Sequence, residues 1–239
     1  MDVIVHGAAG RMGQLVCAEL ARRGHTAIGV DRTGAPYATL DGYTGPADLV
    51  IDFSSHVCAD EVAGYCLRRG LPLVEATTGY TPAELHSIEA AAEQIPVFQS
   101  YNMSLGVAIL AKLAGLVSET FGPCDVEIVE THHNRKADAP SGTALLLADA
   151  VAAHRPEVSY VFGRSGHQPR QSGEIGIHAL RMGNVVGDHE IFFATDTQTI
   201  TLRHQAHDRA LFAEGAVRAA EFLQGRAPGL YHMDDLLGR

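Results

Sequence analysis

The N-terminal segment alternates between strand and helix patterns, and this alternation constrains the fold more than any other feature of the sequence. Residues 2–6 (DVIVH) form an apolar strand pattern that runs directly into the glycine-rich segment 7–13 (GAAGRMG). A helix with apolar residues at helical spacing follows, and residues 26–30 (TAIGV) form a second strand pattern that ends at Asp31. A strand, a glycine-rich turn, a helix, a strand and a terminal acid make a dinucleotide-binding βαβ unit, so the sequence predicts a Rossmann-like parallel sheet.

The glycine-rich turn is predicted to hold the pyrophosphate of NADH or NADPH, because glycines allow a tight turn and a close approach of the backbone. Its glycines are spaced GxxGxxG, with Ala9 at the second glycine position of the common pattern, and a turn without a ligand is the alternative. Asp31 is suited to the ribose hydroxyls, whereas Arg32 is either a 2′-phosphate ligand or a plain surface residue. The predicted cofactor residues here are Gly7, Ala8, Ala9, Gly10, Arg11, Met12, Asp31 and Arg32.

The alternation of strands and helices continues through residue 103. Strand patterns lie at 49–53, 73–75 and 96–99, and helix patterns lie at 57–69 and 82–93. Because open parallel sheets bind ligands at the carboxyl ends of their strands, we expect the residues after each strand to line a nicotinamide pocket. These residues are Phe53, Ala76, Thr77, Thr78, Ser100, Tyr101, Asn102 and Met103; ordinary loop chemistry is the alternative for each.

The second half of the chain has a different pattern. Helix patterns lie at 106–121, 144–153 and 208–224, and strand patterns lie at 126–129, 175–181, 185–194 and 198–204. Three consecutive strands without intervening helices indicate an antiparallel or mixed sheet. We therefore expect an α+β unit in this half, whose sheet offers a surface for assembly, and a final helix that returns to cover the first sheet.

The segment 130–143 (ETHHNRKADAPSGT) carries the strongest chemical signal. It joins an apolar strand to a helix, and it offers two imidazoles, an ammonium group and the free N–H groups of a helix start. That combination indicates a site for an anionic substrate that must also receive a proton. Solvated histidines in a tight turn are the alternative, and a zinc site at His132 and His133, with help from His204 and His207, is a weaker one.

Composition limits the partners of this chain of 239 residues. A formal net charge of −10 argues against a nucleic-acid partner. It also means that an anionic substrate must be drawn in by local basic groups, for which Lys136, Arg135, Arg164, Arg170 and Arg181 are candidates. The four cysteines form no CxxC pair or zinc spacing, no signal peptide precedes the first strand, and no apolar run has the length of a membrane span. We expect a cytoplasmic protein without a metal.

Residues 130–144 (ETHHNRKADAPSGTA) closely resemble the signature of the 4-hydroxy-tetrahydrodipicolinate reductases, also called dihydrodipicolinate reductases. Five further motifs resemble that family in the same order along the chain. They are GAAGRMG at 7–13, Asp-Phe-Ser at 52–54, Thr-Thr-Gly at 77–79, Asn-Met-Ser at 102–104 and Val-Gly-Asp-His at 186–189. The chain departs from the family at Ala76, which replaces the usual glycine, and at Met103, which replaces the usual phenylalanine.

The resemblance implies a dinucleotide-binding domain made of residues 1–103 and 208–239, and a substrate-binding and assembly domain made of residues 104–207. It implies a homotetramer that transfers hydride from NADH or NADPH to C4 of a cyclic imine dicarboxylate, with loss of water, in the diaminopimelate route to lysine. It also implies that His132 donates a proton and that Lys136 assists protonation. The substrate carboxylates would be held by His133, Lys136, Ser141, Gly142 and Thr143. The alternatives are an aspartate or homoserine dehydrogenase type, which should lack the His-His-to-Ser-Gly-Thr run, and a regulator that binds NAD(P)H without turnover.

Overall fold

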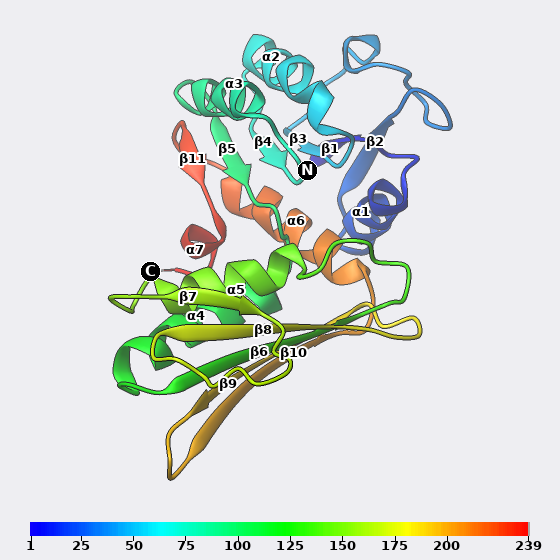
Figure 1. Ribbon diagram of the computed structural model, residues 1–239. Coiled ribbons are helices and arrows are strands. Elements are labelled where there is room, and N and C mark those ends of the chain that lie inside the picture. Colours follow the sequence, from blue (N-terminus) through cyan, green and yellow to red (C-terminus); the bar gives the residue numbers. More distant parts are fainter. Residues whose placement is uncertain (239) are drawn as a thin grey trace. The chain divides into compact units, whose positions relative to one another are not determined.

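The chain folds into two compact units, each with its own sheet (Figure 1). The structure is a computed structural model, and it describes residues 1–238. The first unit comprises Met1–Leu105 together with the segment from Arg209 on, and the second comprises Gly106–Asp208. None of the helices among the described residues is long and apolar enough to cross a bilayer.

The first unit is built on six parallel strands in the order β11-β5-β4-β3-β1-β2. The strands are β1 (Asp2–His6), β2 (Thr26–Val30), β3 (Leu49–Asp52), β4 (Leu73–Glu75), β5 (Pro96–Gln99) and β11 (Gly229–Tyr231). The helices are α1 (Arg11–Arg22), α2 (Ala59–Arg69), α3 (Pro82–Ala92), α6 (Ala210–Leu223) and the short α7 (Met233–Leu236). Helices α2 and α3 cover one face, and α1 and α6 cover the other (Figure 1). The predicted Rossmann-like sheet is confirmed.

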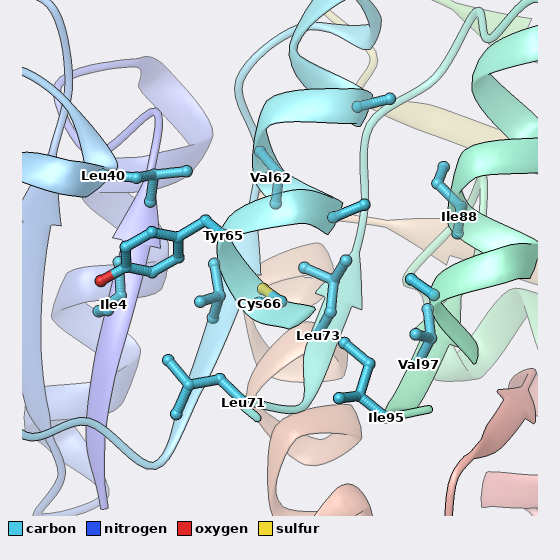
Figure 2. Packing of buried hydrophobic residues seen from close by; sticks show 14 of the residues in the cluster. Ile4, Leu40, Val62, Tyr65, Cys66, Leu71, Leu73, Ile88, Ile95 and Val97 are labelled. Carbon is cyan, nitrogen blue, oxygen red and sulfur yellow. The ribbon is translucent and has the colours of Figure 1, made fainter. Parts of the chain in front are cut away.

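Apolar side chains fill the space between the parallel sheet and helices α2 and α3. Ile4, Leu73 and Val97 project from the strands and pack against Val62 of α2 and Ile88 of α3 (Figure 2). All five are fully buried, and burying a side chain of this size contributes about 1.5–3 kcal/mol. This apolar layer is the main source of the unit's stability.

The same face of the sheet ends in a row of buried polar residues. His6, Asp52, Glu75 and Gln99 are partners in register across β1, β3, β4 and β5, two residues beyond the apolar layer. Asp52 accepts hydrogen bonds from Nδ1 of His6 at 2.7 Å and from Oγ1 of Thr77 at 2.9 Å. These bonds tie the loop after β4 to the ends of β1 and β3.

The pKa values of the two carboxyl groups in this row are shifted in opposite directions. Burial opposes ionisation of Asp52, but the hydrogen bonds and charge interactions with its neighbours, His6 first among them, together outweigh burial and hold the pKa of Asp52 below its usual range. Burial raises the pKa of Glu75 well above its usual value, and the negative charge of Asp52 raises it further. One oxygen of Glu75 is bonded by the hydroxyl of Tyr80, and the other has no hydrogen-bond partner among residues 1–238. Glu75 therefore keeps its proton to a higher pH than an ordinary glutamate does.

The second unit is built on a five-stranded mixed sheet in the order β10-β9-β6-β8-β7. Its strands are β6 (Asp125–His132), β7 (Ser159–Phe162), β8 (Glu174–Arg181), β9 (Gly187–Ala194) and β10 (Thr199–Ala206). Helices α4 (Leu105–Thr120) and α5 (Gly142–Ala152) contribute Leu110, Ala114, Leu147 and Val151 to the core on one face of the sheet. The predicted mixed sheet is confirmed, because β6 is parallel to β8 and antiparallel to β9.

The short connection between β8 and β9 crosses the end of β6. Although only a turn separates β8 from β9 in the sequence, β6 lies between them in the sheet. The backbone N–H of Met182 donates to the carbonyl of His132 at 2.9 Å, and that of Asn134 donates to the carbonyl of Gly183 at 3.2 Å. This crossover places the last residue of β8, Arg181, and the first of β9, Gly187, on either side of His132.

Several element ends differ from the sequence-based expectation. Helix α2 begins at Ala59 rather than Val57, because residues His56–Cys58 form a 3₁₀ turn. Helix α5 begins at Gly142 rather than Ala144, because Ser141 is its N-cap. Strand β6 extends to His132, beyond its apolar part, because Glu130 and His132 occupy the next two buried positions in the alternating pattern of the strand. The short elements β7, β11 and α7 were not predicted, since runs of three or four residues carry little periodic signal.

We predict that Gly13 is required for packing α1 onto the glycine-rich turn. A Cβ atom at Gly13 would lie 2.7 Å from Cα of Ala8, which is backbone. Gly13→Ala should therefore lower the free energy of unfolding by about 1–3 kcal/mol in denaturant titrations. Gly64 in α2 is the control, since its nearest contact would be the flexible Arg68 at 3.5 Å, and Gly64→Ala should raise stability by about 0.5–1 kcal/mol. Equal effects would contradict this packing.

We also predict that Glu75 makes stability fall with rising pH. The folded chain keeps the Glu75 proton, whereas the unfolded chain releases it above about pH 4.3. The free energy of unfolding therefore falls as pH rises, by up to about 1.4 kcal/mol per pH unit, until Glu75 ionises in the folded chain as well. Glu75→Gln has no such proton to lose. In urea titrations it should gain stability relative to the wild type between about pH 5 and pH 8.

Glu84 provides a control of opposite sign for that experiment. The backbone N–H of Thr81 and the side chain of His56 lower the pKa of Glu84, so its contribution to stability is present above its unfolded pKa and lost as pH falls. Glu84→Gln should therefore lose stability relative to the wild type as pH rises to about 4.3, and the difference should stay constant between about pH 5 and pH 8. If the Glu75→Gln and wild-type curves are parallel, Glu75 is not the protonated group described above.

Candidate functional site

The glycine-rich turn leaves the backbone exposed where α1 begins. Gly7 has φ of +82°, and a Cβ atom there would lie 2.8 Å from the carbonyl oxygen of Phe53, so the turn requires glycine. The backbone then enters α1 with Gly10 at the N-cap and Gly10 and Arg11 exposed. The first N–H groups of a helix lack intrahelical partners and lie at the positive end of its dipole. This geometry fits a diphosphate.

Asp31 lies beside this turn, at the end of β2. One oxygen of its carboxylate accepts the backbone N–H of Ala9 at 3.0 Å, which ties the second strand to the turn. The other oxygen remains available to a ribose hydroxyl. Arg32 is exposed next to it. The predicted cofactor residues of the turn and of the end of β2 are thus brought together.

The predicted nicotinamide residues follow β3, β4 and β5 but differ in exposure. Ala76, Thr77 and Met103 are buried, whereas Thr78 and Tyr101 are exposed. The Thr77 hydroxyl donates to Asp52, and the Ser100 hydroxyl donates to the carbonyl of Asn102 at 2.8 Å. Phe53, Ser100 and Asn102 are half-buried. Thr77 and Ser100 therefore shape the loops through their side chains.

A buried carboxylate organises the second unit at the end of β6. Glu130 is fully buried, and both of its oxygens accept from the guanidinium of Arg181 at 2.8 Å. Nδ1 of His132 lies 2.5 Å from Oε2, and the backbone N–H of Ser141 lies 3.1 Å from Oε1. Burial works against ionisation, but the hydrogen bonds from His132 and Arg181 outweigh it and lower the pKa of Glu130 to about 2.

A second buried histidine lies against the first. His189 of β9 is the register partner of Glu130, and its ring is 5.2 Å from that of His132 in an edge-to-face arrangement. Its Nε2 is 3.2 Å from Oγ of Ser141. Burial, with the positive charge of nearby His132 as a further cause, lowers the pKa of His189 to about 4. His189 is therefore neutral near pH 7, and it packs the catalytic candidate His132 without adding charge.

The loop after β6 carries Lys136. Its ammonium group lies 2.8 and 2.7 Å from the two carboxylate oxygens of Asp138, and this pairing lowers the pKa of Asp138. Asp138 is exposed, and its backbone carbonyl accepts from Arg181 at 2.7 Å. The loop that presents Lys136 is thus anchored to the same guanidinium that holds Glu130. His133 is half-buried at the start of the loop.

The loop ends at the N-terminus of α5. Ser141 is buried, and its hydroxyl caps the helix by accepting the backbone N–H of Ala144 at 3.2 Å. Gly142 is exposed and Thr143 half-buried in the first turn. The first turn of a helix favours bound anions. Ser141 therefore has a structural role at this helix start.

The other basic candidates are engaged elsewhere. Arg164 pairs with Glu174, and Arg170 pairs with Glu127 and with Asp125. Arg135 donates to the side chain of Asn184, and Lys136 pairs with Asp138 in the loop after His132. Arg181 is the candidate that the structure places directly beside His132, as its register partner. In the described part of the chain, no group of three or more His, Cys, Asp or Glu side chains is arranged to hold a metal ion.

Sequence reasoning missed the carboxylates at both sites. Glu130 lies two residues before His132 on one strand, so the two side chains share a face, and this spacing was an available signal. Glu75 ends an apolar strand just as Asp52 does, which predicts a polar group at the edge of the sheet. The partnership of Glu130 with Arg181 had no local signal, since it depends on β8 pairing with β6.

Comparison with known proteins places this chain in a family. Residues 1–103 match the family model described as dihydrodipicolinate reductase, N-terminus, and residues 106–237 match the one described as dihydrodipicolinate reductase, C-terminus. A protein from Caldanaerobacter subterraneus named 4-hydroxy-tetrahydrodipicolinate reductase is 43% identical, across 98% of this chain and 97% of its own. One of the same name from Akkermansia muciniphila is 42% identical, across 100% and 98%.

Solved structures agree at the level of the fold. A dipicolinate-bound dihydrodipicolinate reductase from Paenisporosarcina sp. TG-14 is similar with a TM-score of 0.80 at 24% identity, across 97% of both chains. An aspartate dehydrogenase from Thermotoga maritima is similar with a TM-score of 0.51 at 12% identity, across 95% of this chain and 98% of its own. The family matches confirm the resemblance seen in the sequence motifs: the chain belongs to the dihydrodipicolinate reductase family.

Proposed function

We propose that the protein reduces 4-hydroxy-tetrahydrodipicolinate to tetrahydrodipicolinate, with NADH or NADPH as the hydride donor and loss of water, in the diaminopimelate route to lysine. The observation that carries this proposal is the cluster at the end of β6. There His132, the ammonium group of Lys136 and the start of α5 lie on one short segment of the second unit. A proton donor, a cation and an anion-binding helix start are what an imine dicarboxylate requires.

The dinucleotide-binding domain comprises residues 1–103 and 208–239 in this proposal. The turn from Gly7 to Met12 holds the diphosphate, and Asp31 and Arg32 hold the adenine ribose. The loops after β3, β4 and β5 hold the nicotinamide ring through Phe53, Ala76, Thr77, Thr78 and Ser100 to Met103. The absence of a Cβ at Gly7 and the exposed helix start support this fit. When bound, the reduced nicotinamide supplies the hydride.

The substrate-binding domain comprises residues 104–207. The N–H groups of Gly142 and Thr143, with His133 and Lys136, bind the carboxylates, and Ser141 fixes the helix start through its cap. A substrate carboxylate competes with Asp138 for the Lys136 ammonium group, because the Asp138 side chain is exposed and an exposed ion pair contributes little free energy. The surface pair is therefore exchanged for a ligand at low cost.

Protonation completes the chemistry that the chain's own residues perform. Hydride addition to a conjugated imine builds up negative charge, which a positioned acid must neutralise. His132 donates that proton, because imidazole changes its charge near neutral pH. Lys136 keeps a fixed positive charge beside the developing electron density.

We further propose a homotetramer in the cytoplasm that takes a dicarboxylate as its small-molecule partner. Exposed Phe162 and Leu180 on strands of the mixed sheet support assembly through the second unit, since exposed apolar side chains on a sheet favour a protein partner. The four free cysteines fit a reducing compartment. Light scattering coupled to size exclusion tests the tetramer, and a monomer at micromolar concentration would contradict it.

The reaction is tested by following NADH and NADPH oxidation at about 340 nm while the preceding synthase makes the substrate from pyruvate and aspartate semialdehyde. Oxidation that depends on the synthase supports the proposal and ranks the two cofactors. Cofactor binding without oxidation would indicate a sensor or another dehydrogenase instead.

We predict that Lys136→Ala lowers kcat/KM for the dicarboxylate by about 10²–10³-fold, because it removes both a carboxylate ligand and the fixed positive charge. The dissociation constant of NADH, measured by fluorescence, should stay unchanged. The only other lysine in the sequence, Lys112, is exposed on α4, and Lys112→Ala is the control. Equal activity of the two variants would contradict the role of Lys136.

We predict that Arg32→Ala weakens NADPH binding by about tenfold or more and leaves NADH binding nearly unchanged, because only NADPH carries the 2′-phosphate. Arg68→Ala is a matched control, since Arg68 is also exposed in the first unit and pairs with Asp41. Calorimetric titration with both cofactors measures the effect. Parallel losses for NADH and NADPH would contradict a 2′-phosphate contact.

A further inference from the structure

Each oxygen of the Glu130 carboxylate lies against two nitrogen atoms of the described residues. Oε2 faces Nδ1 of His132 and one nitrogen of Arg181, and Oε1 faces the other nitrogen of Arg181 and the backbone N–H of Ser141. An ionised carboxylate accepts hydrogen bonds and has none to donate. The hydrogen of the 2.5 Å contact between His132 and Glu130 therefore belongs to Nδ1 of His132.

This assignment leaves Nε2 as the nitrogen of His132 that gains and loses a proton. In the neutral ring Nε2 carries a lone pair, and in the charged ring it carries the transferable proton. The residue beside Nε2 is Gly187, where an added Cβ atom would come within 3.0 Å of that nitrogen. The lack of a side chain at Gly187 keeps Nε2 from being covered by β9.

We propose that Glu130 is the positioning residue of the proton donor: it holds His132 as the Nδ1–H tautomer, with Nε2 directed at the substrate, and Arg181 holds Glu130 in place. The proposal deepens the reductase function argued above and rests on it for its kinetic consequence. Its structural content, the tautomer of His132, stands without any substrate.

The position of Arg181 follows from the crossover of the mixed sheet. Arg181 is the register partner of His132, because β8 runs parallel to β6. Its guanidinium bonds Glu130 with both terminal nitrogens and also reaches the carbonyl of Asp138, in the loop that carries Lys136. With the bond from Ser141, one carboxylate therefore fixes His132, the Lys136 loop and the start of α5 relative to one another.

The remaining charged or titratable groups near His132 do not replace Glu130. His189 on β9 interacts with His132, with His204 on β10 and with Asp188, and Arg181 interacts with Asp138 in the loop that carries Lys136. His189 is neutral near pH 7, with its Nε2 at Ser141. Burial lowers the pKa of His204, and Asp138 is paired with Lys136. Glu130 is thus the anion that contacts the His132 ring.

The direct test is a long-range proton–nitrogen correlation spectrum of the wild-type protein with ¹⁵N-labelled histidine, recorded above neutral pH without ligand. The His132 signals are identified by their loss in His132→Gln. We expect the pattern of the Nδ1–H tautomer. The pattern of the Nε2–H tautomer would overturn the proposal. This measurement needs neither a folded Glu130 variant nor reductase activity, so it separates the positioning role from the proposed reaction.

The kinetic test compares Glu130→Gln with Glu174→Gln. Glu174 is also a buried glutamate of the second unit bonded to an arginine, Arg164, at 2.8 Å, but it contacts no histidine. We expect Glu130→Gln to lower kcat by about 10²–10⁴-fold with little change in KM, as for other acids that orient a catalytic histidine. The alkaline limb of its kcat profile should move to lower pH, because the ring loses its anionic partner.

Glu174→Gln should keep the wild-type kcat and pH profile even if it melts at a lower temperature. A Glu130→Gln enzyme that is folded by circular dichroism and retains wild-type kcat and pH profile would overturn the positioning role. If Glu130→Gln fails to fold, the wild-type spectrum alone decides the proposal. If the wild type shows no reductase activity, the spectrum still decides the tautomer, and the proposed reaction fails separately.

Discussion

A carboxylate can be buried only where donors surround it, and this constraint shapes the chemical end of both sheets. Asp52 in the parallel sheet and Glu130 in the mixed sheet are buried at the ends of apolar strands. Donors to these carboxylates come from loops and from neighbouring strands. Each carboxylate therefore fixes the loops that follow its sheet, and the apolar layers beneath supply the stability that makes such burial tolerable.

The two buried carboxylates are stabilised by different partners. Asp52 is balanced by His6 and lies beside Glu75, whose raised pKa keeps a second negative charge out of the row. Glu130 is balanced by the fixed charge of Arg181, so it stays ionised and can orient His132. Removing one partner of such a buried pair typically costs about 3–5 kcal/mol. The conservative Glu→Gln changes are therefore the informative ones, because they keep the size of the side chain.

Much of this arrangement could be predicted from the sequence, and the rest depended on tertiary pairing. The strand at 26–30 and the start of a helix at residue 82 follow from local rules and were predicted as observed. The run from Glu130 to Ala144 is specific enough to indicate the family by its residues alone. The partnership of Glu130 with Arg181 was not predictable, because β6 inserts between β8 and β9 although these are joined by a short turn. Local patterns specify a strand but not its neighbours.

The central claim is that the segment from His132 to Thr143 is a dicarboxylate site whose proton donor is set by Glu130. A crystal structure of the protein with pyridine-2,6-dicarboxylate tests it most directly. We expect one carboxylate at the N–H groups of Gly142 and Thr143, the Lys136 ammonium group moved from Asp138 to the ligand, and Nε2 of His132 facing the ring. A ligand bound away from this segment, or a His132 ring turned so that Nε2 faces Glu130, would contradict the claim.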